Sequence, residues 1–354
     1  NLFHKMKISK KKTKTKFFKK LFVKLCRKLG YEIIDQNDLF IPTLEHYANQ
    51  NLSTANHQSI TIPLGKINIT RKVNDLTIII RSYTSTEVDR SKVMLDQNKD
   101  RIFKSPKIDY TLRTISSLIK SCNNALKDFE NLNIKLLITD DNSSKENLHL
   151  IKTLMSKSQL KYKIFNIDKD EFEEIINKND ENGKEISKAM ISNMRNILKS
   201  VFLTKTEAND LIYFVEDDYL HDENAISEML FTYEKITSQL EREIFLCPAD
   251  YPYLYKKLDR ARILLGHKRH WRTVNETLIT FLTSKKMILK YWENFVSLGT
   301  IRHHPMEKKL HEIYEKEFCL SPIPSLAMHA TNVNSAYGIP PNYDWKKNWE
   351  DNEI

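Results

Sequence analysis

Short apolar runs and longer amphipathic segments alternate along this chain from residue 75 onward. Runs rich in isoleucine, leucine and valine predict buried strands, and they cover residues 76–82, 134–139, 162–167 and 210–215. Segments with apolar residues at helical spacing predict helices, and they cover residues 107–127, 145–157, 186–203 and 223–236. Because strands and helices alternate, we expect right-handed βαβ units and an α/β fold with a mostly parallel central sheet and flanking helices.

The first 30 residues follow a different pattern. Residues 1–16 are rich in lysine and lack apolar periodicity, so we expect them to be disordered. Residues 17–29 place aromatic and aliphatic side chains at helical spacing, with lysine and arginine between them. This predicts a basic amphipathic helix that ends at Gly30. Such a helix lies on an anionic membrane surface or packs on the core of its own protein, and the sequence leaves both alternatives open.

The pattern divides the chain into four parts. Residues 1–30 form the basic arm, 31–74 a connector, 75–332 one large α/β domain, and 333–354 a C-terminal tail. A chain of 354 residues is long enough for one large domain with such appendages. The tail contains two consecutive prolines and two tryptophans, and we expect it either to close over the site or to be disordered.

Composition excludes several classes of protein. With only 6 glycines, the chain contains neither GxGxxG nor GxxxxGK[ST], so bound phosphates must be held by a metal, by side chains or by a helix N-terminus. The four cysteines are scattered without a CxxC pair, which favours reduced thiols. No run of 18 apolar residues is present. We therefore expect a cytoplasmic protein, peripheral on the inner face of the membrane if the arm binds lipid.

The net charge of +10 is typical of proteins with polyanionic partners. Much of the excess, however, lies in residues 5–28, whereas the remainder of the chain is more nearly balanced. A nucleic-acid-binding protein would interleave basic and aromatic residues across its folded domain. We therefore expect no nucleic acid among the partners.

Acidic residues directly follow two of the predicted strands, as Asp140-Asp141 and as Glu216-Asp217-Asp218. Ligands of open α/β sheets bind at the carboxyl ends of the strands. A divalent cation held there by carboxylates can bridge phosphate oxygens and absorb the charge of a departing diphosphate. The alternation of side chains places Glu216 and Asp218 on one side, which makes Asp218 the first candidate ligand. Acids after a strand are also common in solvated turns and helix caps.

Three motifs resemble those of glycosyltransferases of the GT-A fold, most closely those of family 2. Residues 138–143 (ITDDNS) resemble the "xxDDxS" strand end, residues 192–196 (SNMRN) the "xxARN" helix, and residues 214–218 (FVEDD) the DxD motif, with Glu in place of the first Asp. The resemblance covers about residues 76–225. It implies that residues 75–225 bind the nucleotide-sugar and that residues 226–332 bind the acceptor.

The resemblance implies roles for individual residues. Asp218 would bind Mn²⁺ or Mg²⁺. From the alternation of side chains alone, we expect Glu216 to support this metal or to contact the nucleotide, and Asp217 to reach the sugar. Asp140 or Asp141 would contact the nucleoside. Arg195 would support the acidic cluster or the phosphates, with an ordinary surface arginine as the alternative. His329, past the last core element, would be a further metal ligand or merely a structural histidine.

Candidate residues of the acceptor half are harder to assign. Trp271 would stack on a sugar, and Arg272 or Arg269 would neutralise phosphate, unless Trp271 belongs to the core and the arginines to the surface. A transfer with inversion needs a carboxylate that takes a proton from the acceptor hydroxyl. Glu307, at the start of a predicted helix, is one candidate, although the helix dipole alone favours an acid there. Asp250 is the other.

The leading hypothesis is a metal-dependent, inverting glycosyltransferase. Its donor would be a UDP- or GDP-type nucleotide-diphosphate sugar, and its acceptor a cell-surface glycan or a lipid-linked saccharide. A sugar-phosphate nucleotidyltransferase is the alternative enzyme, but residues 81–85 lack the glycines usual after its first strand. A non-enzymatic protein that binds nucleic acid or membrane is the alternative of another class. The enzyme hypothesis requires residues 140–141 and 216–218 to face each other, with a cavity between them.

Overall fold

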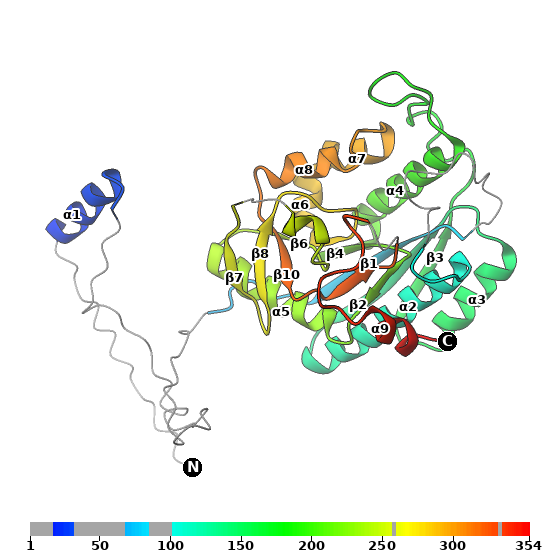
Figure 1. Cartoon of the computed structure of the whole chain (residues 1–354), viewed down its shortest axis with the longest axis horizontal. Coiled ribbons are helices and arrows are strands. Elements are labelled where there is room, and N and C mark those ends of the chain that lie inside the picture. Colours follow the sequence, from blue (N-terminus) through cyan, green and yellow to red (C-terminus); the bar gives the residue numbers. More distant parts are fainter. Residues whose placement is uncertain (1–16, 32–67, 85–100, 257–259, 332–334) are drawn as a thin grey trace, which may run out of the picture. The chain divides into compact units, whose positions relative to one another are not determined.

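The computed structural model describes residues 17–31, 68–84, 101–256, 260–331 and 335–354 (Figure 1). The chain separates into two compact units, Asn1–Lys66 and Ile67–Ile354. The first contains helix α1 (Phe17–Lys28), after which Gly30 adopts the left-handed conformation expected at a helix end. The disorder predicted for residues 1–16 lies outside the described residues.

The second unit is built on a nine-stranded sheet in the order β3-β2-β1-β4-β9-β6-β10-β8-β7. The four strands of one half run parallel: β1 (Asp75–Ser82), β2 (Asn133–Asp140), β3 (Lys161–Asn166) and β4 (Leu211–Glu216). The other half is mixed: β6 (Phe245–Leu246), β7 (Ile263–Leu265), β8 (His270–Val274), β9 (Phe281–Ser284) and β10 (Cys319–Ile323). In it, β9 and β8 run antiparallel to their neighbours. A second, two-stranded sheet pairs β5 (Tyr219–His221) with β11 (Ala327–His329).

Helices cover both faces of the large sheet (Figure 1). On one face lie α2 (Lys107–Asp128), α3 (Lys145–Ser156) and α5 (Ala225–Leu240). On the other lie α4 (Lys188–Glu207), α6 (Lys285–Lys290), α7 (Trp292–Thr300) and α8 (Lys308–Tyr314). The 3₁₀ helix η2 (Pro252–Tyr255) and helix α9 (Trp345–Asp351) complete the unit. None of the helices within the described ranges combines the length and apolar character needed to cross a bilayer.

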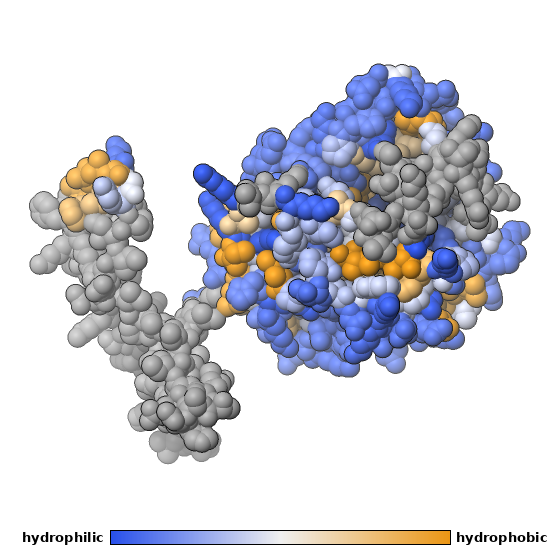
Figure 2. Space-filling model, viewed as in Figure 1, coloured by the Kyte–Doolittle hydropathy of each residue, from blue (hydrophilic) through white to orange (hydrophobic). Residues whose placement is uncertain are grey.

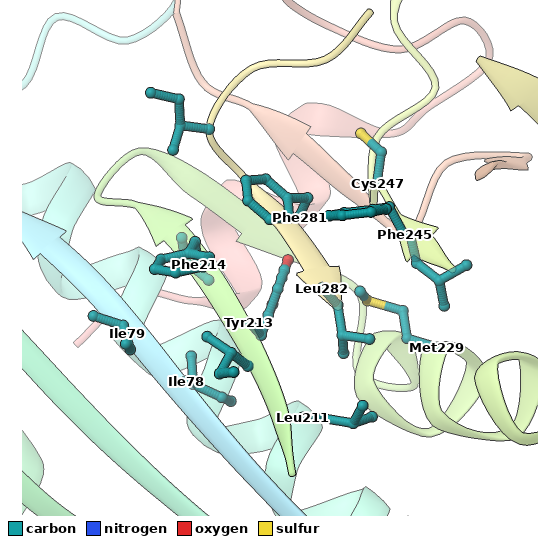
Figure 3. Packing of buried hydrophobic residues seen from close by; sticks show 14 of the residues in the cluster. Ile78, Ile79, Leu211, Tyr213, Phe214, Met229, Phe245, Cys247, Phe281 and Leu282 are labelled. Atoms are coloured by element: carbon teal, nitrogen blue, oxygen red, sulfur yellow. The ribbon is translucent and has the colours of Figure 1, made fainter. Parts of the chain in front are cut away.

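Burial on both faces explains why the strands are continuous apolar runs. Ile78, Ile79 and Ile80 of β1 are all fully buried, as expected for a parallel strand covered by helices on both sides. Figure 3 shows side chains of β1, β4 and β9, among them Ile78, Tyr213 and Phe281, within one packed core. The four strands predicted from the sequence are confirmed, each to within one residue. The expected α/β architecture with flanking helices is therefore present, with a sheet that is parallel in one half and mixed in the other.

Part of the expected connector belongs to the folded unit. The Arg71 guanidinium pairs with Asp210 at 2.5 Å and with Glu243 at 3.1 Å, and the Val73 N–H donates to Glu234 at 2.7 Å. These contacts are made by polar side chains far apart in the sequence, so apolar periodicity did not reveal them. The compact unit begins at Ile67 rather than at residue 75.

The C-terminal tail is folded in its described part, residues 335–354. Helix α9 packs Trp349 against α2, where its ring stacks on Phe103 at 3.8 Å and meets Tyr110 edge-on at 4.7 Å. The Arg113 guanidinium lies 4.2 Å from the Trp349 ring. The expectation of a disordered tail is therefore wrong for these residues, because the two tryptophans supply a buried aromatic contact.

Candidate active site

Strand register brings the two acidic strand ends together. β1 lies between β2 and β4, with Ser82 opposite Asp140 and Arg81 opposite Glu216. The residues after β1 bond to both sides: the Tyr83 N–H donates to Asp217 Oδ2 at 3.0 Å, and the Thr84 N–H donates to Ser143 Oγ at 3.0 Å.

Ser143 completes this bridge, because its hydroxyl donates to Asp140 Oδ1 at 2.6 Å. Burial raises the pKa of Asp140 despite the hydrogen bonds from Ser143, and the charge of Asp217 raises it further. Asp140 and Asp217 therefore lie on either side of the β1 end, close enough for the charge of Asp217 to act on Asp140, which meets the first of the two conditions of the enzyme hypothesis.

Lys107, the first residue of α2, inserts its ammonium group between the two carboxylates that follow β4. Its Nζ lies 2.6 Å from Asp217 Oδ1 and 3.3 Å from Asp218 Oδ2. Asp217 also accepts a hydrogen bond from the Thr111 hydroxyl at 3.1 Å. Burial acts to raise the pKa of Asp218, but the charges of Lys107 and His329 outweigh it and hold this pKa well below its usual value. Asp218 is therefore ionised, and both carboxylates already have the Lys107 ammonium beside them.

His329 reaches the same carboxylate from the opposite side. Its Nε2 lies 3.4 Å from Asp218 Oδ1, and its Nδ1 lies 2.9 Å from the carbonyl oxygen of Tyr337. The ring stacks on Tyr219 at 4.7 Å. Burial lowers the pKa of His329, but the charge of Asp218 and the hydrogen bond to it raise the pKa overall. The Tyr337 carbonyl fixes the ring with Nε2 toward the acid.

Glu216 is held by a buried arginine. Arg81 Nη2 lies 3.0 Å from Glu216 Oε1, and the Thr280 hydroxyl donates to Glu216 Oε2 at 3.2 Å. The Arg81 side chain is only 5% exposed, and its Nη1 donates to Asn193 Oδ1 at 3.3 Å. Glu216 thus joins strands β1, β4 and the segment before β9. This partner set favours a supporting role for Glu216 over direct metal ligation.

Asp141 meets the helix whose sequence resembles the "xxARN" motif. The Ser192 hydroxyl donates to Asp141 Oδ2 at 2.7 Å, and Arg195 Nη1 lies 3.3 Å from the same oxygen. Burial raises the pKa of Asp141 in spite of these contacts. Asn196 donates to the carbonyl oxygens of Ser82 and Thr139 at 3.0 and 3.2 Å. Arg195 is therefore part of the acidic cluster rather than a surface arginine.

Glu307 lies on the acceptor side, immediately before helix α8. Burial, reinforced by the charge of Glu216, raises the pKa of Glu307 to about 7. The acidic loop before α4 holds its segment in place: Glu181 bonds to His303 Nδ1 at 3.0 Å and to Lys308 Nζ at 2.8 Å, and Asp180 to His304 Nε2 at 2.8 Å. A carboxyl group with a pKa near neutrality is suited to acid–base chemistry.

Four other candidates make structural contacts instead. Trp271 is fully buried in β8, and its indole N–H donates to Glu228 at 3.2 Å. Of the two roles considered for it, the structure shows a core residue and not one exposed for stacking on a sugar. Arg272 forms a buried ion pair with Asp250, which also accepts a hydrogen bond from Tyr255. Because β8 lies inside the sheet, these side chains point into packed surroundings. Arg269 is bound to Asp222 at 2.8 Å.

Two basic residues near the site were missed by sequence reasoning. Lys107 contacts both carboxylates, as described, and the charge of Arg101 acts on Asp218. The Arg101 guanidinium lies 4.9 Å from the Tyr110 ring. The only sequence signal was a lysine directly after Pro106, at the start of a predicted helix.

A divalent ion fits the pair Asp218 and His329. Within the part of the chain that the structure describes, no group of three or more His, Cys, Asp or Glu side chains is arranged as a metal site. The Asp218 carboxylate nevertheless suits Mn²⁺ or Mg²⁺, whereas an imidazole is a ligand more typical of other transition metals, and one or two protein ligands suffice when phosphates and water complete the coordination shell. The donors at Asp218 and His329, 3.4 Å apart, meet this requirement.

The sequence matches no protein-family model and no curated protein. Solved structures similar to this chain include Staphylococcus aureus TarS 1-349, at 10% identity and a TM-score of 0.33, over 61% of this chain and 48% of that one. The UTP-bound UGPase from Acinetobacter baumannii is 7% identical with a TM-score of 0.38, over 79% and 92% of the two chains. The galactosyltransferase LgtC, in complex with donor and acceptor sugar analogs, is 11% identical with a TM-score of 0.31, over 66% and 70%.

The neighbours of this fold thus include glycosyltransferases as well as a UTP-binding enzyme. The match spans about half the length of TarS 1-349 and 32% of the longer TarS chain. Any assignment of activity to this chain rests on its own strand-end residues.

Proposed function

We propose that this protein is a metal-dependent, inverting glycosyltransferase. It takes a sugar from a UDP- or GDP-type nucleotide-diphosphate sugar and passes it to a cell-surface glycan or a lipid-linked saccharide. The observation that carries the proposal is the meeting of Asp140 and Asp217 around the end of β1, bridged by residues 82–84. Ligands of open α/β sheets bind at such strand ends.

The donor side uses the acids and their partners. Asp218 and His329 would hold Mn²⁺ or Mg²⁺, which supplies positive charge to the departing diphosphate. Asp140 and Asp141 face the nucleoside, and Asp217 faces the sugar. Arg195 supports this side by holding Asp141.

The acceptor side uses Glu307 as general base. With a pKa of about 7, its carboxylate accepts the proton of the acceptor hydroxyl at neutral pH. The acceptor oxygen then bonds to the anomeric carbon as the bond from that carbon to the diphosphate breaks. Asp250 is the weaker candidate because its charge is neutralised by Arg272.

Ligand-dependent stabilisation tests this assignment. Thermal unfolding of the full chain would be followed with UDP, GDP, dTDP and CMP compounds, with and without Mn²⁺. We expect stabilisation by one nucleotide diphosphate that requires the ion, vanishes in Asp218→Ala and persists in Asp128→Ala, an exposed acid at the end of α2. If no nucleotide diphosphate stabilises the protein with either ion, the proposal is wrong. Formation of a nucleotide-sugar from UTP and a sugar 1-phosphate would instead identify a nucleotidyltransferase.

We further infer that α1 attaches the protein to an anionic membrane surface. Its apolar side chains are exposed, with Leu21 at 56%, Phe22 at 58% and Leu25 at 55% (Figure 2). Lys24 and Lys28 are exposed on the same helix. Apolar burial together with attraction to anionic lipid is the combination that binds such helices to membranes. A lipid-linked acceptor would be reached from this surface.

A further inference from the structure

The Lys107 ammonium occupies the position between Asp217 and Asp218 that a cation needs. Its Nζ is 2.6 Å from one carboxylate and 3.3 Å from the other. We propose that Lys107 is a tethered cation of the donor site: it neutralises the acid pair between turnovers, is displaced from Asp218 when a divalent ion binds, and then carries its charge to the donor diphosphate. The diphosphate part of this inference rests on the proposed function, whereas the exchange with the ion does not.

The local charge balance requires such an exchange. Asp217 and Asp218 contribute two negative charges, which Lys107 and His329 face from opposite sides. A divalent ion at Asp218 would add two positive charges beside an ammonium that touches the same carboxylate. Like charges at such separations repel strongly in a buried site, so the ion and Lys107 compete for Asp218.

Lys107 is able to move without disturbing its surroundings. Its side chain is 19% exposed, and a lysine is a compact point charge on a flexible four-carbon stem. The backbone beneath it is fixed, because Tyr110 packs against Phe103 and Trp349. Asp217 stays in place as well, since the Tyr83 N–H and the Thr111 hydroxyl hold its second oxygen independently of Lys107.

Arg101 is a second cation that acts on Asp218 and has a buried donor available for an anion. Arg101 Nη1 is buried and, among the described residues, makes no hydrogen bond. A buried donor without a partner is costly, and a phosphate oxygen would satisfy it. The charge of Arg101 already acts on Asp218. Lys107 and Arg101 are thus two cations that act on Asp218, and charged donors of this kind are suited to the oxygens of a diphosphate.

Metal binding without nucleotide tests the exchange. Mn²⁺ binding to the full chain would be measured by electron paramagnetic resonance in wild type, Lys107→Met and the control Lys104→Met, which removes an exposed lysine from the same segment. We expect Lys107→Met to bind Mn²⁺ about tenfold more tightly than wild type, since a competing charge is removed. Lys104→Met should bind as wild type does. Equal or weaker binding in Lys107→Met, or no Mn²⁺ binding by either protein, would overturn the proposal.

The second half of the exchange is tested with UDP and GDP at saturating Mn²⁺. Whichever binds should bind about tenfold more weakly to Lys107→Met, as expected for the loss of one charge-assisted contact; unchanged affinity would overturn the transfer of the charge to the diphosphate. Lys107→Gln serves if the methionine variant does not fold. If Lys107→Met binds Mn²⁺ more tightly but neither UDP nor GDP binds, the proposed transferase function is wrong and the exchange is supported. If the wild type turns over a nucleotide-sugar but Lys107→Met has unchanged Mn²⁺ affinity, the function is supported and the exchange is wrong.

Discussion

His329 Nε2 lies 3.4 Å from Asp218 Oδ1, although the two residues are far apart in the sequence. The pairing of β11 with β5 sets His329 opposite Tyr219, the residue that follows Asp218. A two-stranded sheet thus delivers a histidine to the end of β4, beside the acids of the large sheet. The contact is the basis of the proposed cation site.

Removing this histidine should weaken metal binding without unfolding the protein. We expect His329→Ala to lose Mn²⁺ affinity by about 10–100-fold, the usual cost of disturbing a metal site. His270→Ala, an exposed histidine on β8, is the matched control and should bind like wild type. Titration of Mn²⁺ measures both. Retained affinity in His329→Ala would remove this residue from the metal site.

The pH profile should report on Glu307. Because burial raises its pKa to about 7, the base is protonated and inactive at low pH, so kcat/KM should rise with pH and level off above about 7. Glu307→Gln should lower kcat by about 10²–10⁴-fold, the usual contribution of a general base. Initial rates from pH 5 to 9 measure both effects. A profile that keeps its inflection in Glu307→Gln would point to another base.

The same carboxyl group should affect stability in a pH-dependent way. Its folded-state pKa lies above its ordinary value of 4.5, so the folded state binds the proton more tightly, and stability is lost as pH rises from about 4.5 through about 7. Glu307→Gln should therefore melt higher than wild type at pH 8 and differ less at pH 5. Glu315→Gln, which changes an exposed acid at the end of α8, should show no such trend. Calorimetry at the two pH values decides.

The C-terminal helix should stabilise the start of α2. Trp349→Ala removes a ring that stacks on Phe103 and meets Tyr110, and we expect it to lower the free energy of unfolding by about 3 kcal/mol. Trp345→Ala should cost less, because this ring meets Phe103 only edge-on at 5.4 Å. Urea unfolding measures both. Equal losses would show that the cluster is not centred on Trp349.

Membrane binding by α1 should need both its apolar and its basic side chains. The double variant Leu21→Glu and Leu25→Glu, at two exposed positions, should lose at least about tenfold in affinity for vesicles of phosphatidylglycerol and phosphatidylcholine. Wild type should bind pure phosphatidylcholine weakly, because the lysines then have no anionic partner. Co-sedimentation checks both results. If the double variant binds like wild type, α1 is not the anchor.

The parallel half of the fold was predictable because its strands are continuous apolar runs in the sequence. Ile78, Ile79 and Ile80 form a β-branched run that is buried on both faces, and such a run is typical of a parallel strand covered by helices on both sides. The acids after β2 and β4 could be placed for the same reason, since they follow such runs directly. Their convergence follows from parallel register.

Residues 226–332 were harder to predict, because the identity of a side chain there did not show whether it points into the core or toward the surface. Trp271 and Arg272 are residues that often bind sugars and phosphates, yet they lie in a short strand whose neighbours bury them. Lys107 was missed for the opposite reason: a lysine at a helix start is ordinary in sequence. Only the packing of α2 against β5, the strand that directly follows the two acids, gives it two carboxylates as partners.

The three residues after Arg81 tie the two acidic groups into one rigid piece, because consecutive backbone amides bond to Asp217 and to Ser143. Neither group can shift without the other, so this half of the site has little freedom to change its geometry. Glu307, in contrast, sits on a segment fastened through Glu181 by His303 and Lys308. These are side-chain contacts, which single substitutions can remove, so the position of Glu307 is open to change whereas that of the backbone-held acids is not.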